Sequence, residues 1–256
     1  MKNLFLCGLL LAMGMSQSAL ATESKSESHQ CAALAKHLGV QYHIVETHVV
    51  DTKKNQTRTE EKDFNLWRND GLVAHEYLDT KLTFIWNQTP NGQLKGLQAF
   101  DDYDRAIEYE PRSAREKHKG EAWQEQYQLF SEATLSAMTL KVERGSGCER
   151  EQEFERVSGD TKRRLVWLPE LKIARSYSAH NKGNSVEWTA KELIREPKKV
   201  SAAISRRLDY QTTDYADVGD NESDPFLLKM VNLGFIAHGS EGFYDADGHP
   251  LQGHHH

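Results

Sequence analysis

Cysteine is scarce in this chain, and no two cysteines have the spacing of a metal or redox site. The 256 residues include three cysteines, Cys7, Cys31 and Cys148, and no C-x-x-C motif. This spacing argues against a zinc-binding or reactive thiol pair. If Cys7 is removed with a leader, Cys31 and Cys148 remain. Two cysteines in an oxidising compartment usually pair, so we expect a disulfide between Cys31 and Cys148.

Long apolar runs are also missing after the first residues. Leu4–Met15 is the one extended run, and at about a dozen residues it is shorter than the roughly 20 that span a bilayer. Lys2 precedes it and Ala19–Ala21 follows it, which is the three-part pattern of a secretory signal peptide. We therefore expect a periplasmic, not membrane-spanning, bacterial protein. The expected parts are a signal peptide at 1–21, a single α+β domain at 22–236 and a histidine-rich tail at 237–256.

The chain has no surplus of positive charge. Its 32 Lys and Arg residues face 38 Asp and Glu residues, which gives a net charge of −6 at pH 7. An acidic chain gains no electrostatic attraction to nucleic acid or to anionic lipid. We therefore expect no nucleic-acid partner.

Recognisable catalytic motifs are absent from the sequence as well. There is no G-x-S-x-G motif. Neighbouring carboxylates such as Asp101 and Asp102 are adjacent in sequence, and such pairs usually face solvent. The sequence assigns no catalytic residue and favours a non-enzymatic protein. An enzyme assembled from scattered residues, such as His75, Asp104 and Glu108, is an alternative that one sequence does not reveal.

Alternation of apolar and polar residues with a period of two is abundant. Tyr42 and Ile44, for example, alternate with His43 and Val45, which is typical of half-buried strands. The turn sequence Asn69-Asp70-Gly71 is a signal for an antiparallel hairpin. Strands are expected at 41–50, 64–66, 73–77, 82–86, 94–100, 105–110, 140–144, 152–157, 164–168, 173–178 and 186–194.

Helical spacing is confined to the start, the middle and the end of the chain. We expect a first helix at 28–38 that stops at Gly39, and a central helix at 121–138. Pro197 and Pro225 each occupy a position where proline begins a helix. Between these last two helices, residues 210–223 are expected to form a polar loop.

These elements together predict the fold class. So many strands exceed what a strongly twisted open sheet carries flat, so the sheet must curl. The few helices suffice to cover one face. We predict an α+β fold, a large curved antiparallel sheet (a half-barrel) with helices packed on its concave face.

One segment gives the layout a family resemblance. Residues 164–175 (Arg-Leu-Val-Trp-Leu-Pro-Glu-Leu-Lys-Ile-Ala-Arg) are followed by a turn and then by Val186-Glu187-Trp188. This pair of strands, within the layout of residues 41–194, resembles the periplasmic lipoprotein-carrier family and its outer-membrane-lipoprotein-sorting relatives. The resemblance implies a cavity under a curved sheet. The helical segment 197–236 departs from the family pattern.

Tryptophan supplies a candidate ligand site. Each of the five tryptophans lies on an expected strand or helix and is compatible with facing inward. If they line a hollow, they make an apolar pocket for a lipid-like or aromatic ligand. The alternative is that they fill the space between sheet and helices. The candidate residues are Trp67, Trp86, Trp123, Tyr127, Trp167 and Trp188.

Histidines near the C-terminus supply a second candidate. Imidazole together with carboxylate suits zinc or copper. A purification tag, a turn or a solvated end explains the same residues. No other cofactor is expected. The candidate metal ligands are His238, His249, His254, His255 and His256.

The function that these features favour is binding without chemistry. We expect a periplasmic protein that holds an apolar small molecule or a lipid-like segment in the cavity of a curved sheet, with a protein partner as a further option. A metal-binding accessory protein that uses the C-terminal histidines is the alternative.

Overall fold

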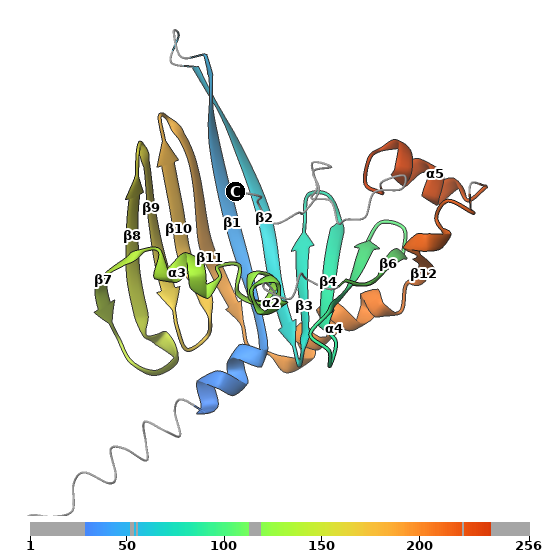
Figure 1. The fold of residues 1–256 in the computed structure, drawn as a ribbon, viewed down its shortest axis with the longest axis horizontal. Coiled ribbons are helices and arrows are strands. Elements are labelled where there is room, and N and C mark those ends of the chain that lie inside the picture. Colours follow the sequence, from blue (N-terminus) through green and yellow to red (C-terminus); the bar gives the residue numbers. More distant parts are fainter. Residues whose placement is uncertain (1–28, 52–53, 55, 113–118, 222, 237–256) are drawn as a thin grey trace, which may run out of the picture.

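Twelve strands form a single sheet in the computed structural model, which describes residues 29–51, 54, 56–112, 119–221 and 223–236 (Figure 1). The first six strands are β1 (His37–Asp51), β2 (Gln56–Asn69), β3 (Leu72–Tyr77), β4 (Leu82–Gln88), β5 (Leu94–Phe100) and β6 (Arg105–Arg112). The others are β7 (Thr139–Arg144), β8 (Glu151–Ser158), β9 (Thr161–Leu168), β10 (Ile173–Asn181), β11 (Asn184–Ile194) and β12 (Gln211–Asp214).

The strand order divides the sheet into two meanders joined at β1. The order is β12-β6-β5-β4-β3-β2-β1-β11-β10-β9-β8-β7, so β1 pairs with β2 on one side and with β11 on the other. Both pairings are antiparallel. The sequence therefore predicts both meanders correctly, and the long-range β1–β11 pairing unites them.

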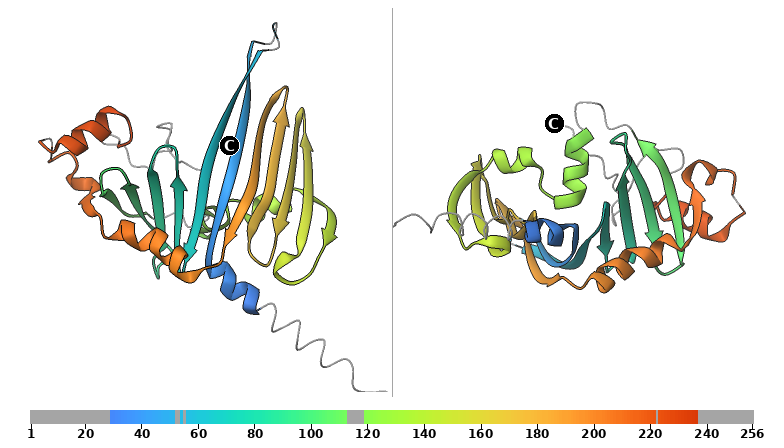
Figure 2. Two further views of the ribbon diagram at one scale, coloured as in Figure 1. Left: turned by 180° about the vertical axis from the view of Figure 1, so that it is seen from behind. Right: turned by 90° about the horizontal axis from the view of Figure 1, so that it is seen from below.

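The sheet is strongly curved, and helices lie on both of its sides. Figure 2 shows α2 (Lys119–Gln128) and α3 (Glu132–Ser136) in the hollow of the sheet, and α4 (Pro197–Leu208) on the outer, convex face. The predicted α+β half-barrel is confirmed. Helices pack on the concave face as predicted, and α4 lies in addition on the convex face, where Val200 and Ile204 pack against a separate apolar patch.

That second apolar patch follows from strand alternation. On β2, Phe64 and Leu66 belong to the concave cluster, and their neighbour Trp67 therefore faces the convex side. There Trp67 packs with Ala74, Ile85 and α4. In central strands that are buried on both faces, residues pointing to either face are apolar, so apolar side chains occupy successive positions.

The N-terminal helix is shorter than the sequence suggests. It covers residues 29–36, and β1 begins at His37. Gly39 is therefore a strand residue paired with Trp67 and Ile194, not a helix stop. A Cβ atom at Gly39 would lie 2.4 Å from Cζ3 of Trp67. The glycine is needed for close approach of an aromatic ring.

The expected central helix 121–138 is broken into α2 and α3. Leu129 adopts a left-handed conformation with φ 65° and ends the first helical run. Ser131 then begins α3 as its N-cap, and its hydroxyl accepts a hydrogen bond from the amide of Thr134. The turn lets the two short helices follow the curved hollow. One straight helix over residues 121–138 would not follow that curvature.

The C-terminal third contains the two expected helices and an additional strand. α4 begins at Pro197, and α5 (Pro225–Asn232) begins at Pro225, with Asp224 as its N-cap. Within the expected polar loop, β12 pairs parallel with β6. The four residues of β12 are mostly exposed and show no apolar–polar alternation, so the sequence does not predict this strand. It is ordered by pairing with the edge strand β6.

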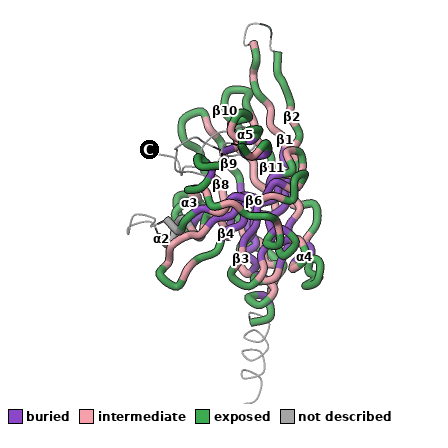
Figure 3. The backbone as a smooth tube through the Cα atoms, turned by 90° about the vertical axis from the view of Figure 1, so that its right-hand side faces the viewer, coloured by how far each residue is buried: buried purple, intermediate pink, exposed green. Residues whose placement is uncertain are grey.

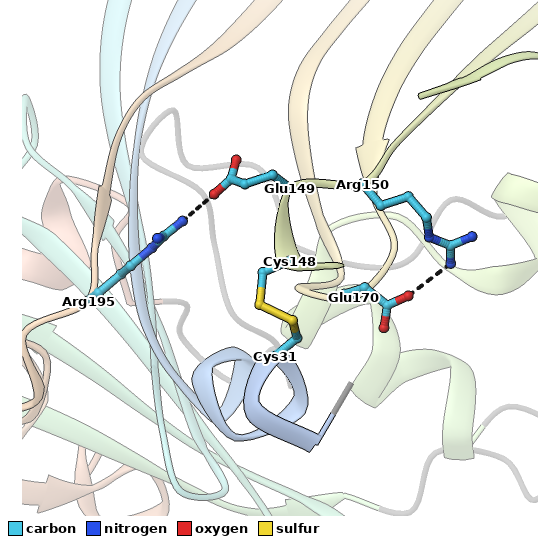
Figure 4. The surroundings of a disulfide bond; sticks show 6 residues. All are labelled: Cys31, Cys148, Glu149, Arg150, Glu170 and Arg195. Carbon is cyan, nitrogen blue, oxygen red and sulfur yellow. Dashed lines mark hydrogen bonds and ion pairs between the residues drawn. A yellow bond between two sulfur atoms is a disulfide. The ribbon is translucent and has the colours of Figure 1, made fainter. Parts of the chain in front are cut away.

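The disulfide is present as expected. Cys31 in the first helix is bonded to Cys148, 117 residues further on. Figure 4 shows the surrounding ion pairs, in which Arg195 contacts Glu149 at 2.5 Å and Arg150 contacts Glu170 at 2.9 Å. The covalent bond fastens the first helix to the start of the second meander.

Burial is greatest in the middle of the sheet and falls off toward the strand tips and the ends of the molecule (Figure 3). The edge strand β7 is exposed at all of its residues. Among the described residues, no helix is long and apolar enough to cross a membrane. The predicted signal peptide at 1–21 and the tail at 237–256 lie outside the described residues.

Candidate ligand-binding surface

Aromatic rings of both meanders meet on the concave face. Phe64 lies 6.1 Å from Tyr42 and 6.3 Å from Trp188, measured between ring centroids. Phe84 stacks on Trp86 at 6.0 Å. Trp86 is only 4 % exposed. The centre of the hollow is therefore filled by its own side chains, and a ligand-accessible surface must lie toward one side.

His75 fastens α2 to this aromatic layer. Its ring is 4.4 Å from Trp86 and 5.3 Å from Phe64, and its Nε2 is 2.8 Å from the carbonyl oxygen of Gln126. Burial lowers the pKa of His75 to about 4, although the hydrogen bond to Gln126 opposes that shift. His75 is therefore neutral near pH 7 and donates to the helix backbone.

Arg68 joins the first helix, α2 and the second meander. Its guanidinium donates to the carbonyl oxygens of Leu171 at 2.7 Å and Lys172 at 2.6 Å, and lies 3.9 Å from the ring centroid of Tyr127. The Tyr127 hydroxyl donates to the carbonyl of Ala35 at 2.8 Å. Burial lowers the pKa of Arg68. This cluster is a structural junction.

An open groove runs between α3 and the far strands of the second meander. Its volume is about 360 Å³, within the range of roughly 300–1,000 Å³ that is usual for small-ligand sites. Leu140 on the edge strand is 46 % exposed there. Six of the ten lining residues are apolar, and four are polar or charged. The lining residues are Glu132, Leu135, Ser136, Met138, Leu140, Gln152, Phe154, Trp167, Pro169 and Lys172.

The predicted aromatic site residues are divided between these surroundings. Trp86 and Trp188, with Trp123 and Tyr127 of α2, belong to the concave cluster. Trp167 packs on Phe130 and lines the groove. Trp67 is on the convex face, for the alternation reason given above. The structure thus brings together all of the candidate residues except Trp67 on the concave side.

The residues that make the groove open, Leu140 and Phe154, are not among the predicted site residues. Leu140 and Phe154 are direct cross-strand partners on β7 and β8, and both lie in segments whose strand character was recognised. What the sequence does not reveal is that α3 stops short of covering them. The available signal is the pair of apolar residues, Leu140 and Val142, in the otherwise polar sequence of this strand.

A buried polar cluster lies on the convex face beneath α4. The Arg207 guanidinium donates to Asp101 at 2.8 Å through Nε and contacts Glu76 at 2.5 Å through Nη2, and the Tyr210 hydroxyl donates to Asp101 at 3.0 Å. Burial opposes ionisation of Glu76, but Arg207 and hydrogen bonds from Asn65 and other donors outweigh it and lower the pKa of Glu76. Every charge is matched, so the cluster clamps α4 to the sheet.

The residues suggested for an enzyme are not assembled. His75 is buried under α2, Glu108 forms an ion pair with Lys95 at 2.6 Å, and Asp104 has a left-handed φ of 49° in the β5–β6 turn. No hydrogen bond or ion pair joins these three residues in the part of the chain that the structure describes.

Metal binding stays a prediction. Within residues 29–236, as far as they are described, no group of three or more His, Cys, Asp or Glu side chains is arranged to hold a metal ion. The five predicted histidine ligands, His238, His249 and His254–His256, lie outside the described residues.

Comparisons with known proteins identify no family: no family model matches the chain, and no curated protein matches it. Solved structures give low similarity. A chain of the Pseudomonas aeruginosa MucA/MucB complex has a TM-score of 0.28 and 9% identity, over 67% of this chain and 56% of that one. PNGF-II has a TM-score of 0.33 and 8% identity, over 71% of this chain and 32% of that one. A DUF1329 family protein from Desulfovibrio piger has a TM-score of 0.26 and 5% identity, over 67% of this chain and 91% of that one.

This chain thus spans about half of the MucA/MucB chain and about a third of PNGF-II. TM-scores this low do not establish a shared fold. The resemblance to lipoprotein carriers therefore stays a prediction.

Proposed function

We propose that this is a non-enzymatic periplasmic protein that binds an apolar, lipid-like ligand on the concave face of its half-barrel. The binding surface is the groove between α3 and β7–β9, with the aromatic layer behind it. The protein acts by burying apolar surface and not by chemistry. The observation that carries the proposal is the open, partly apolar groove beside the filled centre of the concave face.

The sequence and the disulfide support the compartment. Residues 1–21 have the pattern of a secretory signal, and disulfides persist in oxidising compartments such as the periplasm. The Cys31–Cys148 bond is consistent with such a location.

Energetics support the ligand class. Removing apolar surface from water contributes about 25 cal/mol for each Å² buried. Leu140, Met138 and Phe154 offer such surface to a ligand along one side of the groove. An exposed apolar patch of this kind on a folded domain marks a binding site more often than an isolated exposed leucine does.

The test is binding of a neutral amphiphile. Purified mature protein without added histidines is titrated with dodecanol, by displacement of the fluorescent probe N-phenylnaphthylamine, and native mass spectrometry records any ligand that co-purifies. We expect saturable binding in the wild type. Leu140→Glu places a charge in the groove, and we expect it to weaken binding by about tenfold or more because a carboxylate resists burial.

Val157→Glu is the matched control. Val157 is 69 % exposed on β8 and faces the convex side, so the same charge is added to the same meander away from the groove. Its dodecanol affinity should equal that of the wild type. Absence of saturable binding in the wild type, or equal loss in the two variants, would contradict the proposed function.

A further inference from the structure

Two arginines face each other across β8 and β9 on the concave side. Arg156 is directly opposite Arg163, and the next pair on the same face is Phe154 opposite Leu165. Side chains two residues apart on a strand share a face. The guanidinium pair therefore lies one step beyond Phe154, a lining residue of the groove. Figure 1 shows that β8 and β9 extend beyond α3.

The pair is exceptional because neighbouring arginines on the opposite face are all matched with acids. Arg144 contacts Glu151 at 2.8 Å, Arg164 contacts Glu153 at 2.7 Å, and Arg175 contacts Glu151 at 2.6 Å. In the described residues, Arg156 and Arg163 have no hydrogen-bond or ion-pair partner on their side chains.

Like charges directly opposite each other on a sheet are destabilising. The convex face avoids this arrangement, since its glutamates alternate with its arginines. On the concave face, no acidic side chain among the described residues pairs with the two guanidiniums. An anion between them would supply the missing charge.

We propose that Arg156 and Arg163 bind the phosphate headgroup of an amphiphile whose apolar chain lies in the groove. A phosphomonoester carries about −1.5 to −2 charges at pH 7, which matches two guanidiniums, and arginine binds phosphate through paired N–H donors. Phe154 then lies where the chain leaves the headgroup. This inference rests on the proposed function and names the class of ligand.

The experiment compares ligands that share one chain and differ in headgroup. Dodecyl phosphate, dodecanoate and dodecanol are titrated into the mature protein by probe displacement at constant ionic strength. We expect dodecyl phosphate to bind about tenfold or more tightly than dodecanol, because its bonds to arginine are charge-assisted. Arg156→Gln/Arg163→Gln should remove that advantage and leave dodecanol binding unchanged.

Lys162→Gln/Lys198→Gln is the matched control. It removes the same two charges from exposed positions on β9 and α4, away from the concave face, and should retain the preference for phosphate. The thermal midpoint of the arginine variant should be no lower than that of the wild type, because a repulsion is removed.

The outcomes separate this inference from the proposed function. If dodecanol binds but dodecyl phosphate shows no advantage, or if the advantage survives in the arginine variant, the headgroup site is refuted and the apolar groove stands. Equal loss in the lysine control, or a preference for dodecanoate over dodecyl phosphate, also refutes it. If none of the three ligands binds, both proposals fail.

Discussion

At the scale of single residues, His75 shows how burial of a titratable side chain makes the stability of the fold depend on pH. The ring lies between Phe64 and Trp86 and has its Nε2 on the backbone of α2. Because burial lowers its pKa to about 4, the folded state keeps His75 neutral over a range in which the unfolded chain binds a proton.

This residue should make stability depend on pH. An unfolded histidine titrates near 6.5. The stabilisation from neutral His75 is thus complete above about pH 6.5 and declines as the pH falls toward 4, by up to about 3 kcal/mol. His75→Gln keeps a donor for Gln126 but does not titrate, so its free energy of unfolding should change less between pH 7 and 4.5. Urea unfolding at the two pH values measures the difference.

His180→Gln is the control for this measurement, because His180 is exposed near the end of β10. It should retain the pH dependence of the wild type. If His75→Gln has the same pH dependence as the wild type, burial of the neutral ring is not its source.

At the scale of elements, α4 is held on the convex face by charge as well as by apolar packing. Arg207 is fully buried and contacts both Glu76 and Asp101, whereas its neighbour Arg206 is 56 % exposed. Arg207 is the buried cation that contacts the two carboxylates, and Arg206 contacts them from the surface, at 3.5 Å and 3.7 Å. The helix is therefore clamped at one residue of its last turn.

Removing that cation should be costly. Arg207→Met leaves Glu76 and Asp101 buried without their main partner, and breaking a buried ion pair in this way costs about 3–5 kcal/mol. Arg206→Gln removes an exposed cation from the same carboxylates and should cost at most about 1 kcal/mol. Urea unfolding at pH 7 compares the two. Similar small losses for both variants would show that the cluster does not clamp α4.

The elements also show where sequence reasoning succeeds. Pro197 and Pro225 marked the starts of α4 and α5, and alternation marked both meanders, because these signals are local. Leu129 was predicted to lie within one helix, but it has a left-handed backbone that no local pattern marks. The face that α4 covers depends on Glu76 and Asp101, which are distant in sequence, so no local pattern predicts it.

At the scale of the whole molecule, the disulfide connects the first helix to the beginning of the second meander. The cysteines are 117 residues apart. Closing a loop of that size stabilises a fold by about 4–5 kcal/mol when the effect is entropic. Cysteine count and compartment sufficed to predict this bond, whereas the groove beside α3 emerges only when the whole sheet is assembled.

Cys31→Ser/Cys148→Ser should lower the free energy of unfolding by about 4–5 kcal/mol at pH 7. Dithiothreitol should bring the wild type toward the denaturation midpoint of the variant and leave the variant unchanged. A variant as stable as the oxidised wild type would indicate that the unfolded chain is not restrained by this bond.

The disulfide also has a consequence for the order of folding. The sheet is complete only when β11 reaches β1, and that pairing joins parts of the chain that are far apart in sequence, which is slow because a long loop must close. Cys148 precedes β11 along the chain. Formation of the Cys31–Cys148 bond before β11 is in place therefore shortens the remaining search, and a reduced chain must make that search without this restraint.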